Sequence, residues 1–166
     1  MANSNVYRGS DGSISVSVDS GAEGDSAQAV IDAYSLTPVG RVTGVSVSVE
    51  SDVKPFHELG QRYATELRPG NVNVKGSIDR AFINGALLKM FLGDAASSRP
   101  AGTFISPTFN LSLRMENPAH AGTSSAVTLY GVKLDNWAFD IPEDDFVMEK
   151  VGFQALWVGV ADEEAS

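Results

Sequence analysis

The segment Val45-Ser46-Val47-Ser48-Val49-Glu50 alternates apolar and polar residues at every step. Such alternation places the apolar side chains on one face of an extended chain, so it predicts a half-buried β-strand. The pattern recurs along the sequence, and about seven strands are expected, at residues 14–18, 45–50, 71–79, 109–116, 126–132, 136–141 and 147–160. The last segment is apolar at both alternating positions, which predicts burial on both faces.

One short amphipathic helix is expected at residues 84–93. Asn84 can cap its start, and Gly93 can adopt a positive φ at its end. Four apolar side chains share one face and should pack on the β core: Leu87, Leu88, Phe91 and Leu92. Residues 25–34 fit either a second short helix or an irregular strand, and the sequence does not decide between them.

Three intervals rich in Gly, Pro, Ser, Asn or charge predict loops, at residues 52–69, 94–107 and 116–125. The first is long for a compact domain, and long loops with apolar anchors are typical of functional segments. It contains apolar side chains that a solvent-exposed linker would not need, namely Phe56, Leu59, Tyr63 and Leu67.

The composition indicates one folded domain over residues 1–166, because 43% of the residues are hydrophobic and only 20% are charged. The net charge of −9 argues against a protein that grips nucleic-acid phosphates, which requires clustered cations. No cysteine is present, so disulfides and thiolate metal sites are excluded. No apolar run is long enough for a membrane span, and neither membrane insertion nor a secretion signal is expected.

Catalytic and metal-binding patterns are missing from the sequence. His57 and His120 have no second histidine at ligand spacing, and no phosphate-binding glycine loop or nucleophile motif occurs. The acidic clusters at residues 143–145 and 162–164 could hold a hard cation, but they lack the spacing of a calcium loop and fit a solvated turn and a terminus better. We therefore predict no enzyme activity, no metal and no cofactor.

The polar positions of the alternating strands carry mainly small hydrophilic side chains. They define one hydrophilic sheet face with a formal charge of 2 − 3 = −1: Ser46, Ser48, Glu50, Asn73, Lys75, Ser77, Asp79, Asn110, Ser112, Arg114 and Glu116. Open edges of such a sheet invite pairing with another chain, and several subunits can close one barrel together.

Four segments in a fixed order carry a family resemblance. They are Arg41-Val42-Thr43-Gly44-Val45, Phe56-His57-Glu58-Leu59-Gly60-Gln61-Arg62, Leu67-Arg68-Pro69-Gly70, and Gly76-Ser77-Ile78-Asp79-Arg80-Ala81-Phe82-Ile83-Asn84-Gly85 followed by Leu87-Leu88. This combination resembles the tail tube proteins of long-tailed bacteriophages over about residues 39–93.

The resemblance implies a mainly β fold, a β-sandwich or partial barrel with one short flanking α-helix, which completes a multi-subunit β-barrel in the oligomer. It implies homohexameric rings that stack into a virion tail tube, assembled in the bacterial host cytoplasm, through which DNA passes without specific binding. The expected partners are further copies of the chain, a tail sheath protein, a baseplate or initiator protein and a tail terminator. Residues 1–38 would form an N-terminal arm or hairpin, and residues 52–69 would reach the adjacent ring.

Two sets of residues receive roles from this resemblance. The eleven residues of the hydrophilic sheet face would line the channel. Six further residues would make contacts between subunits or rings: Phe56, Glu58, Leu59, Arg62, Tyr63 and Arg80.

Two alternatives remain open at this stage. The inner tube of a phage-derived contractile injection device would have a nearly identical sequence pattern. A β-sandwich carbohydrate-binding module would also be acidic and free of cysteine, with Tyr130 and Trp137 as its candidate sugar platform. A glycosidase-like enzyme ranks below both, because no carboxylate pair stands out.

Overall fold

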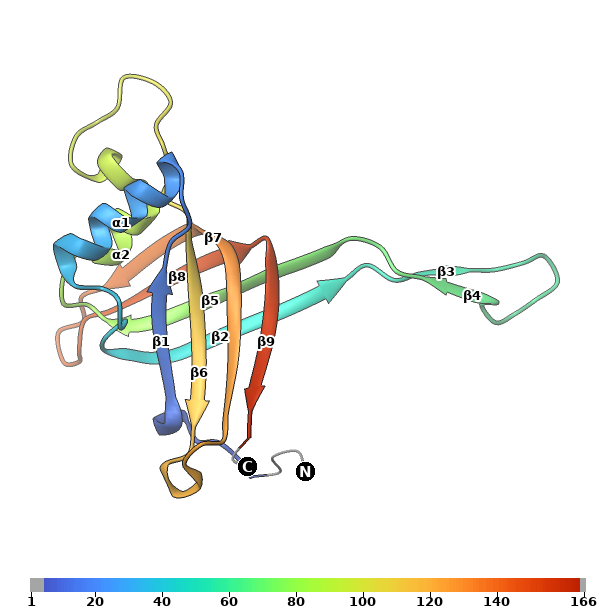
Figure 1. Ribbon diagram of the computed structural model, residues 1–166. Helices are drawn as coiled ribbons and strands as arrows, with labels where there is room; N and C mark the ends of the chain where they lie inside the picture. Colours follow the sequence, from blue (N-terminus) through green and yellow to red (C-terminus); the bar gives the residue numbers. More distant parts are fainter. Residues whose placement is uncertain (1–4, 165–166) are drawn as a thin grey trace.

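A computed structural model describes residues 5–164 of the chain. It is mainly β, as predicted: two sheet layers enclose an apolar core, two helices cover one end, and a long hairpin projects from the body (Figure 1). All described strand pairs are antiparallel: seven strands form one continuous sheet that supplies both layers, and residues 54–56 and 66–68 pair in the separate hairpin.

The long strand β7 (Ser124–Asp140) takes part in both layers. Its first half pairs with β6 (Phe109–Glu116) and β9 (Trp157–Glu163), and β6 pairs with β1 (Gly12–Ser17). We call these four strands sheet A. The second half pairs with β8 (Met148–Ala155), followed by β5 (Val72–Ala81) and β2 (Val42–Ser51), which together form sheet B.

Apolar side chains from both sheets meet in one core, so the hydrophilic faces point outward on both. Val16, Leu111 and Leu129 enter it from sheet A, whereas Ile78 and Val151 enter it from sheet B. The Phe153 ring lies so close over Gly76 that a Cβ at residue 76 would stand 2.7 Å from it. Only a glycine lets this ring pack directly on the backbone of β5.

Two helices cover the core, where one was expected. Residues 25–34, which the sequence leaves undecided, belong to α1 (Ala22–Tyr34), which buries Ala27, Val30 and Ile31. The predicted helix is α2 (Ala86–Leu92), with the Asn84 side chain accepting a hydrogen bond from the Ala86 amide and Gly93 at φ 61°. Its buried residues are Ala86, Leu87 and Met90, so its inward face is rotated from the predicted one.

Three further boundaries differ from the sequence-based prediction. Residues 5–38 contain β1 and α1, not an arm or a hairpin, and residues 1–4 of that expected arm lie outside the described range. The two strands expected at residues 126–132 and 136–141 are the single strand β7. The one expected at residues 147–160 is divided between β8 and β9.

Candidate functional site

Both edges of sheet B lack a strand partner within residues 5–164. β2 pairs only with β5, and the second half of β7 pairs only with β8. Sheet A has one such edge, the outer side of β9, which pairs only with β7 among the described residues. Its other edge, the outer side of β1, is covered by its own chain: the Val16 amide donates to the Thr37 carbonyl at 2.9 Å, and the Val39 amide donates to the Ile14 carbonyl at 3.0 Å. Unpaired edges of this length are templates for another chain, and sheet B is the layer in which both edges are open.

The valines of β2 support this interpretation. Val45 and Val49 lie opposite Ile78 and Val74 of β5, on the core-facing side of the sheet. They are nevertheless exposed, Val45 to 37% and Val49 to 52%, whereas Val47 between them packs against the core, so the described chain covers the core-facing side of this edge only in part. Apolar surface beside an open strand edge is typical of edges that pair with another chain.

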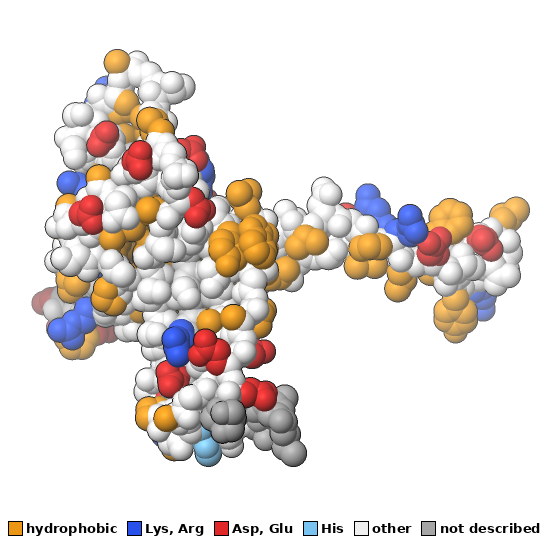
Figure 2. Space-filling model, in the orientation of Figure 1, with side chains coloured by type: hydrophobic (Ala, Val, Ile, Leu, Met, Phe, Trp, Pro, Cys, Tyr) orange, Lys and Arg blue, Asp and Glu red, His pale blue; other side chains and the backbone are white. Residues whose placement is uncertain are grey.

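The interval 52–69 is a hairpin that extends β2 and β5 away from the body (Figure 1). β3 (Lys54–Phe56) pairs with β4 (Glu66–Arg68), and every residue from 49 to 73 is exposed. We call residues 52–69 the arm. Large apolar side chains follow its whole length (Figure 2), which no intrachain contact explains: Val53, Phe56, Leu59, Tyr63 and Leu67.

The arm carries five of the six residues predicted to make contacts between subunits. Phe56, Leu59 and Tyr63 project into solvent with 54%, 106% and 88% exposure, and Glu58 and Arg62 are exposed between them. The structure thus places these side chains where a second copy could reach them. Their contact with another subunit stays a prediction.

Arg80, the sixth residue, was predicted wrongly to make an intersubunit contact. It is 1% exposed, and its Nε donates to Glu149 Oε1 at 2.7 Å. Trp137 Nε1 donates to the other carboxylate oxygen at 2.8 Å, and the Arg80 guanidinium donates to Asn84 Oδ1 at 3.2 Å. Arg80 has the same parity in β5 as the buried Ile78, so it points toward the helices and joins the end of sheet B to the start of α2.

Seven of the eleven predicted channel residues share the outer face of sheet B. Cross-strand pairs show this directly, with Ser46 opposite Ser77, Ser48 opposite Lys75, and Glu50 opposite Asn73. We call this hydrophilic surface the wall face; its predicted members are Ser46, Ser48, Glu50, Asn73, Lys75, Ser77 and Asp79. It continues onto β8 and β7 through the pairs Lys75–Gln154, Asp79–Lys150 and Lys133–Gln154.

The other four predicted channel residues lie on β6, in sheet A. Three of them, Ser112, Arg114 and Glu116, are on the opposite outer surface of the sandwich, whereas Asn110 is buried. Ser112 faces Ser15 and Thr128, and Arg114 forms ion pairs with Glu116 and Glu163. Asn110 is 6% exposed, and its Oδ1 accepts from the Gly131 amide at a register break of β6 and β7. The eleven side chains therefore do not form one surface. Alternation along a strand shows which side chains are polar and share a face of that strand, but it does not show to which of the two sheets the strand belongs.

The aromatic residues form no sugar platform of the predicted kind. Tyr130 stacks on Trp157, with ring centroids 4.1 Å apart, and does not lie beside Trp137. Trp137 packs against Phe82 and Phe139 and donates to Glu149. Tyr130 and Trp137 therefore do not form a pair of coplanar exposed rings on which a sugar ring could stack.

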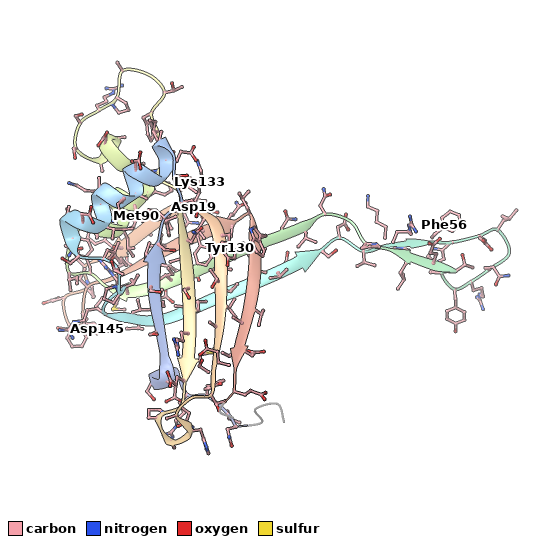
Figure 3. The ribbon with its side chains drawn as sticks, in the orientation of Figure 1. Asp19, Phe56, Met90, Tyr130, Lys133 and Asp145 are labelled. Atoms are coloured by element: carbon pink, nitrogen blue, oxygen red, sulfur yellow. The ribbon has the colours of Figure 1, made fainter. Side chains whose placement is uncertain are left out.

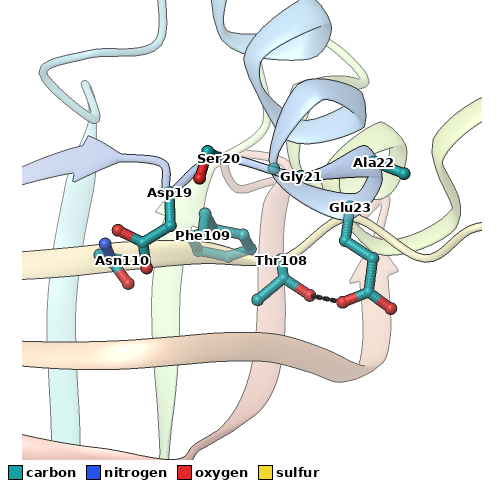
Figure 4. Close-up of a pocket in the computed structure, with 9 residues that line it drawn as sticks. Asp19, Ser20, Gly21, Ala22, Glu23, Thr108, Phe109 and Asn110 are labelled. Carbon is teal, nitrogen blue, oxygen red and sulfur yellow. Dashed lines mark hydrogen bonds between the residues drawn. The ribbon is translucent and has the colours of Figure 1, made fainter.

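The hollow at the start of α1 contains no reactive constellation (Figure 4). Glu23 accepts from Lys133 Nζ at 3.0 Å and from Thr108 Oγ1 at 2.9 Å. The hydrogen bond from Lys133, then that from Thr108, lower the pKa of the Glu23 carboxyl below its ordinary value, so this group is an ionised structural link between α1 and β7. Among the described residues, no group of three or more acidic or histidine side chains is arranged to hold a metal ion.

None of the helices in residues 5–164 is long and apolar enough to cross a bilayer.

No family model matches the sequence, and no curated protein matches it. Solved structures do match the fold. A chain of the SPP1 tail tube has a TM-score of 0.59 and 12% identity, with 96% of this chain and 81% of that chain covered. The chain has the tail-tube fold.

Two chains from contractile devices share this tail-tube fold. One is from the sheath/tube terminator of the extracellular contractile injection system PVC, with a TM-score of 0.65, 11% identity, and coverage of 96% of this chain and 99% of that one. The other is from the tube-terminating cap of the anti-feeding prophage, with a TM-score of 0.67, 7% identity, and coverage of 98% and 95%. At these identities the likeness concerns the fold.

Proposed function

We propose that the chain is a structural tube protein of a phage tail or of a phage-derived contractile injection device, assembled as stacked hexameric rings and without catalytic activity. The observation that carries this proposal is the pair of open edges on sheet B. Pairing of β2 in one copy with the second half of β7 in the next would continue the sheet around a ring. The exposed valines of β2 would be covered by the same contact.

The wall face would then line the channel. Its side chains are small or hydrated, and its predicted members carry Glu50 and Asp79 against Lys75, a sum of 1 − 2 = −1. Lys75 is held by Glu50 at 3.5 Å, so its charge is partly neutralised at the surface. The extended wall face adds Lys133 and Lys150, which also lie beside carboxylates: Lys133 is paired with Glu23 at 3.0 Å, and Lys150 lies opposite Asp79. A wall whose cations are paired in this way, and which has no stacking aromatics, gives a nucleic acid little to bind, which suits DNA in transit.

A sheath, an initiator at the baseplate and a terminator are the further partners of such a tube. A terminating cap is the second candidate function, because the fold matches a chain of the anti-feeding prophage tube cap as well as one of the SPP1 tail tube. A tube protein adds rings without limit, whereas a cap closes one end. The long apolar arm favours the tube, since a head-to-tail contact that repeats needs a projecting surface in every copy.

Electron microscopy of the purified full-length chain tests the proposal. Hollow rings or tubes support it, and a chain that stays monomeric at high concentration in both microscopy and light scattering rejects it. A single ring that does not stack supports the cap instead.

The double variant Phe56→Ala with Tyr63→Ala separates stacking from folding. Both side chains are largely exposed, so the free energy of unfolding of the monomer should change by less than about 0.5 kcal/mol. Tubes should become shorter at the same protein concentration. Unchanged tube lengths would show that Phe56 and Tyr63 of the arm do not contribute to the contact between rings.

A further inference from the structure

The end of sheet B farthest from the arm presents a second exposed apolar surface. The aromatic side chains Phe139 and Phe146 lie there with Ile83 and Ile141, and Phe146 and Ile141 are 80% and 74% exposed. A hydrogen bond from the Phe82 amide to the Val147 carbonyl, 2.9 Å long, holds the end of β5 beside the start of β8. We call Ile83, Phe139, Ile141 and Phe146 the distal patch.

The loop between β7 and β8 adds a negative charge to this patch. Glu143, Asp144 and Asp145 are all exposed and lie between Ile141 and Phe146 in the sequence. Glu143 and Asp144 make no ion pair within residues 5–164. The large apolar side chains of the distal patch are therefore bordered by carboxylates that have no ion-pair partner in the described chain.

The arm has the complementary chemistry. Phe56, Leu59 and Tyr63 supply apolar surface near its tip, and Arg62 lies among them without an ion-pair partner in the described chain. The other two cations of the arm are already paired, Lys54 with Asp52 at 4.0 Å and Arg68 with Glu66 at 2.9 Å. Arg62 is thus the arm cation left for a partner.

The two surfaces lie at opposite ends of the same strands. Figure 3 shows Phe56 far out on the arm and Asp145 at the other side of the molecule. From Asp52 to Gly60 the chain can extend up to about 30 Å beyond the body, at about 3.3 Å per residue. In a head-to-tail stack every copy offers the arm end to the distal end of the next, and such heterologous contacts require two different complementary surfaces on one chain.

We propose that the distal patch is the receptor for the arm of a second copy in the adjacent ring, with Phe56, Leu59 and Tyr63 packed on Phe139, Ile141 and Phe146, and Arg62 paired with Glu143 or Asp144. This inference rests on the proposed function, and it identifies the partner of the arm. It also gives a role to an acidic cluster that the sequence leaves as a solvated turn.

Cross-linking tests the contact on the full chain, which has no cysteine of its own. A variant carrying Tyr63→Cys and Phe146→Cys, treated with a short bismaleimide, should give a ladder of covalent dimers, trimers and longer chains, because each copy links to the next. Each single variant carries a cysteine on only one side of the proposed contact and should give no ladder. The control pair Tyr63→Cys with Trp157→Cys, which probes the exposed aromatic at the arm end of the body, should not produce a ladder.

Charge exchange gives a second measurement. Arg62→Glu and Asp144→Arg should each raise the concentration at which tubes appear by roughly tenfold, and the double variant should return it to within about threefold of the original. Two results would overturn the proposal that the distal patch receives the arm while leaving the proposed function intact. One is tubes that form without a cross-linked ladder from the Tyr63→Cys and Phe146→Cys variant, and the other is normal assembly of both Arg62→Glu and Asp144→Arg. A chain that forms no ring or tube in any variant, including the original sequence, overturns both.

Discussion

The buried pair of Arg80 and Glu149 predicts that Arg80→Met destabilises the fold itself. The substitution would leave the Glu149 carboxylate, 1% exposed, with only Trp137 as a donor, and it would remove the guanidinium that donates to Asn84 beside α2. Breaking a buried ion pair from one side costs about 3–5 kcal/mol. At about 2–4 °C per kcal/mol for a domain of this size, the melting temperature of the monomer should fall by about 6–20 °C.

Arg62→Met is the matched control, because it removes the same charged group from an exposed site on the arm. It should change the free energy of unfolding by less than about 0.5 kcal/mol. Calorimetry or urea titration of both variants under non-assembling conditions decides the matter. A melting temperature of Arg80→Met within about 2 °C of the original would refute the reasoning, since it would mean that the orphaned carboxylate finds water or another donor at a cost below about 1 kcal/mol. Adding Glu149→Leu to Arg80→Met should recover most of the loss, because no buried charge then remains.

Three other sites give predictions of their own. Val49→Lys places a charge at the exposed core-facing side of the β2 edge and should block ring formation in electron microscopy, whereas Ser48→Lys on the wall face should permit rings; equal behaviour of the two would contradict edge pairing through β2. Gly76→Ala should lower monomer stability by about 1–3 kcal/mol in urea titration, because the added Cβ would lie 2.1 Å from the Ser46 carbonyl oxygen and 2.7 Å from the Phe153 ring; a neutral result would show that both neighbours can shift. The pKa of Glu23 is lowered in the folded chain, so its stabilising effect should be present above the ordinary value of 4.5 and lost as the pH falls through the lowered pKa; the stability difference between Glu23→Gln and the original should shrink over that window, and a difference that is constant with pH would exclude the Lys133 link.

The strands could be predicted from the sequence where the alternation of inward-facing apolar and outward-facing polar side chains continues without a break along the whole strand. The alternation at residues 45–50 and 71–79 matches β2 and β5, and both run in one sheet with one face inward. The segment at 147–160 gave a misleading signal because Val151 and Phe153 point inward in β8, whereas Val158 packs on the core from β9. The phase changes at Leu156, where the chain passes from sheet B to sheet A, so the whole run is apolar at both parities.

Local irregularity explains the errors at β7 and α1. β7 continues through two register breaks, one opposite residue 110 of β6 and one at residue 135, and these interrupt its alternation without ending the strand. α1 has alanines on its outer side as well as in its buried face, so its sequence does not show the apolar stripe of an amphipathic helix.

The sequence predicted which kinds of side chain form the candidate site, but it placed only part of them correctly. The long apolar segment at residues 52–69 stood out because Phe56, Leu59 and Tyr63 have no reason to lie in a linker, and the structure exposes all three. Arg80 could have been recognised as inward-facing from its shared parity with Ile78. Nothing in the sequence could show that β1 is covered by residues 37–39, because that contact depends on where α1 returns the chain.

The charge distribution is an independent argument for our proposal that the arm joins copies. Lys54, Arg62 and Arg68 balance Asp52, Glu58 and Glu66, so the arm sums to 3 − 3 = 0 and the rest of the chain carries the whole −9. Bodies of like charge repel over about one Debye length, about 8 Å at physiological ionic strength. A neutral apolar segment that reaches beyond that distance can make contact before the bodies approach. Under the proposal, the acidic loop between β7 and β8 would then attract Arg62 in particular. Assembly should therefore begin at the arm and be completed by edge pairing of sheet B.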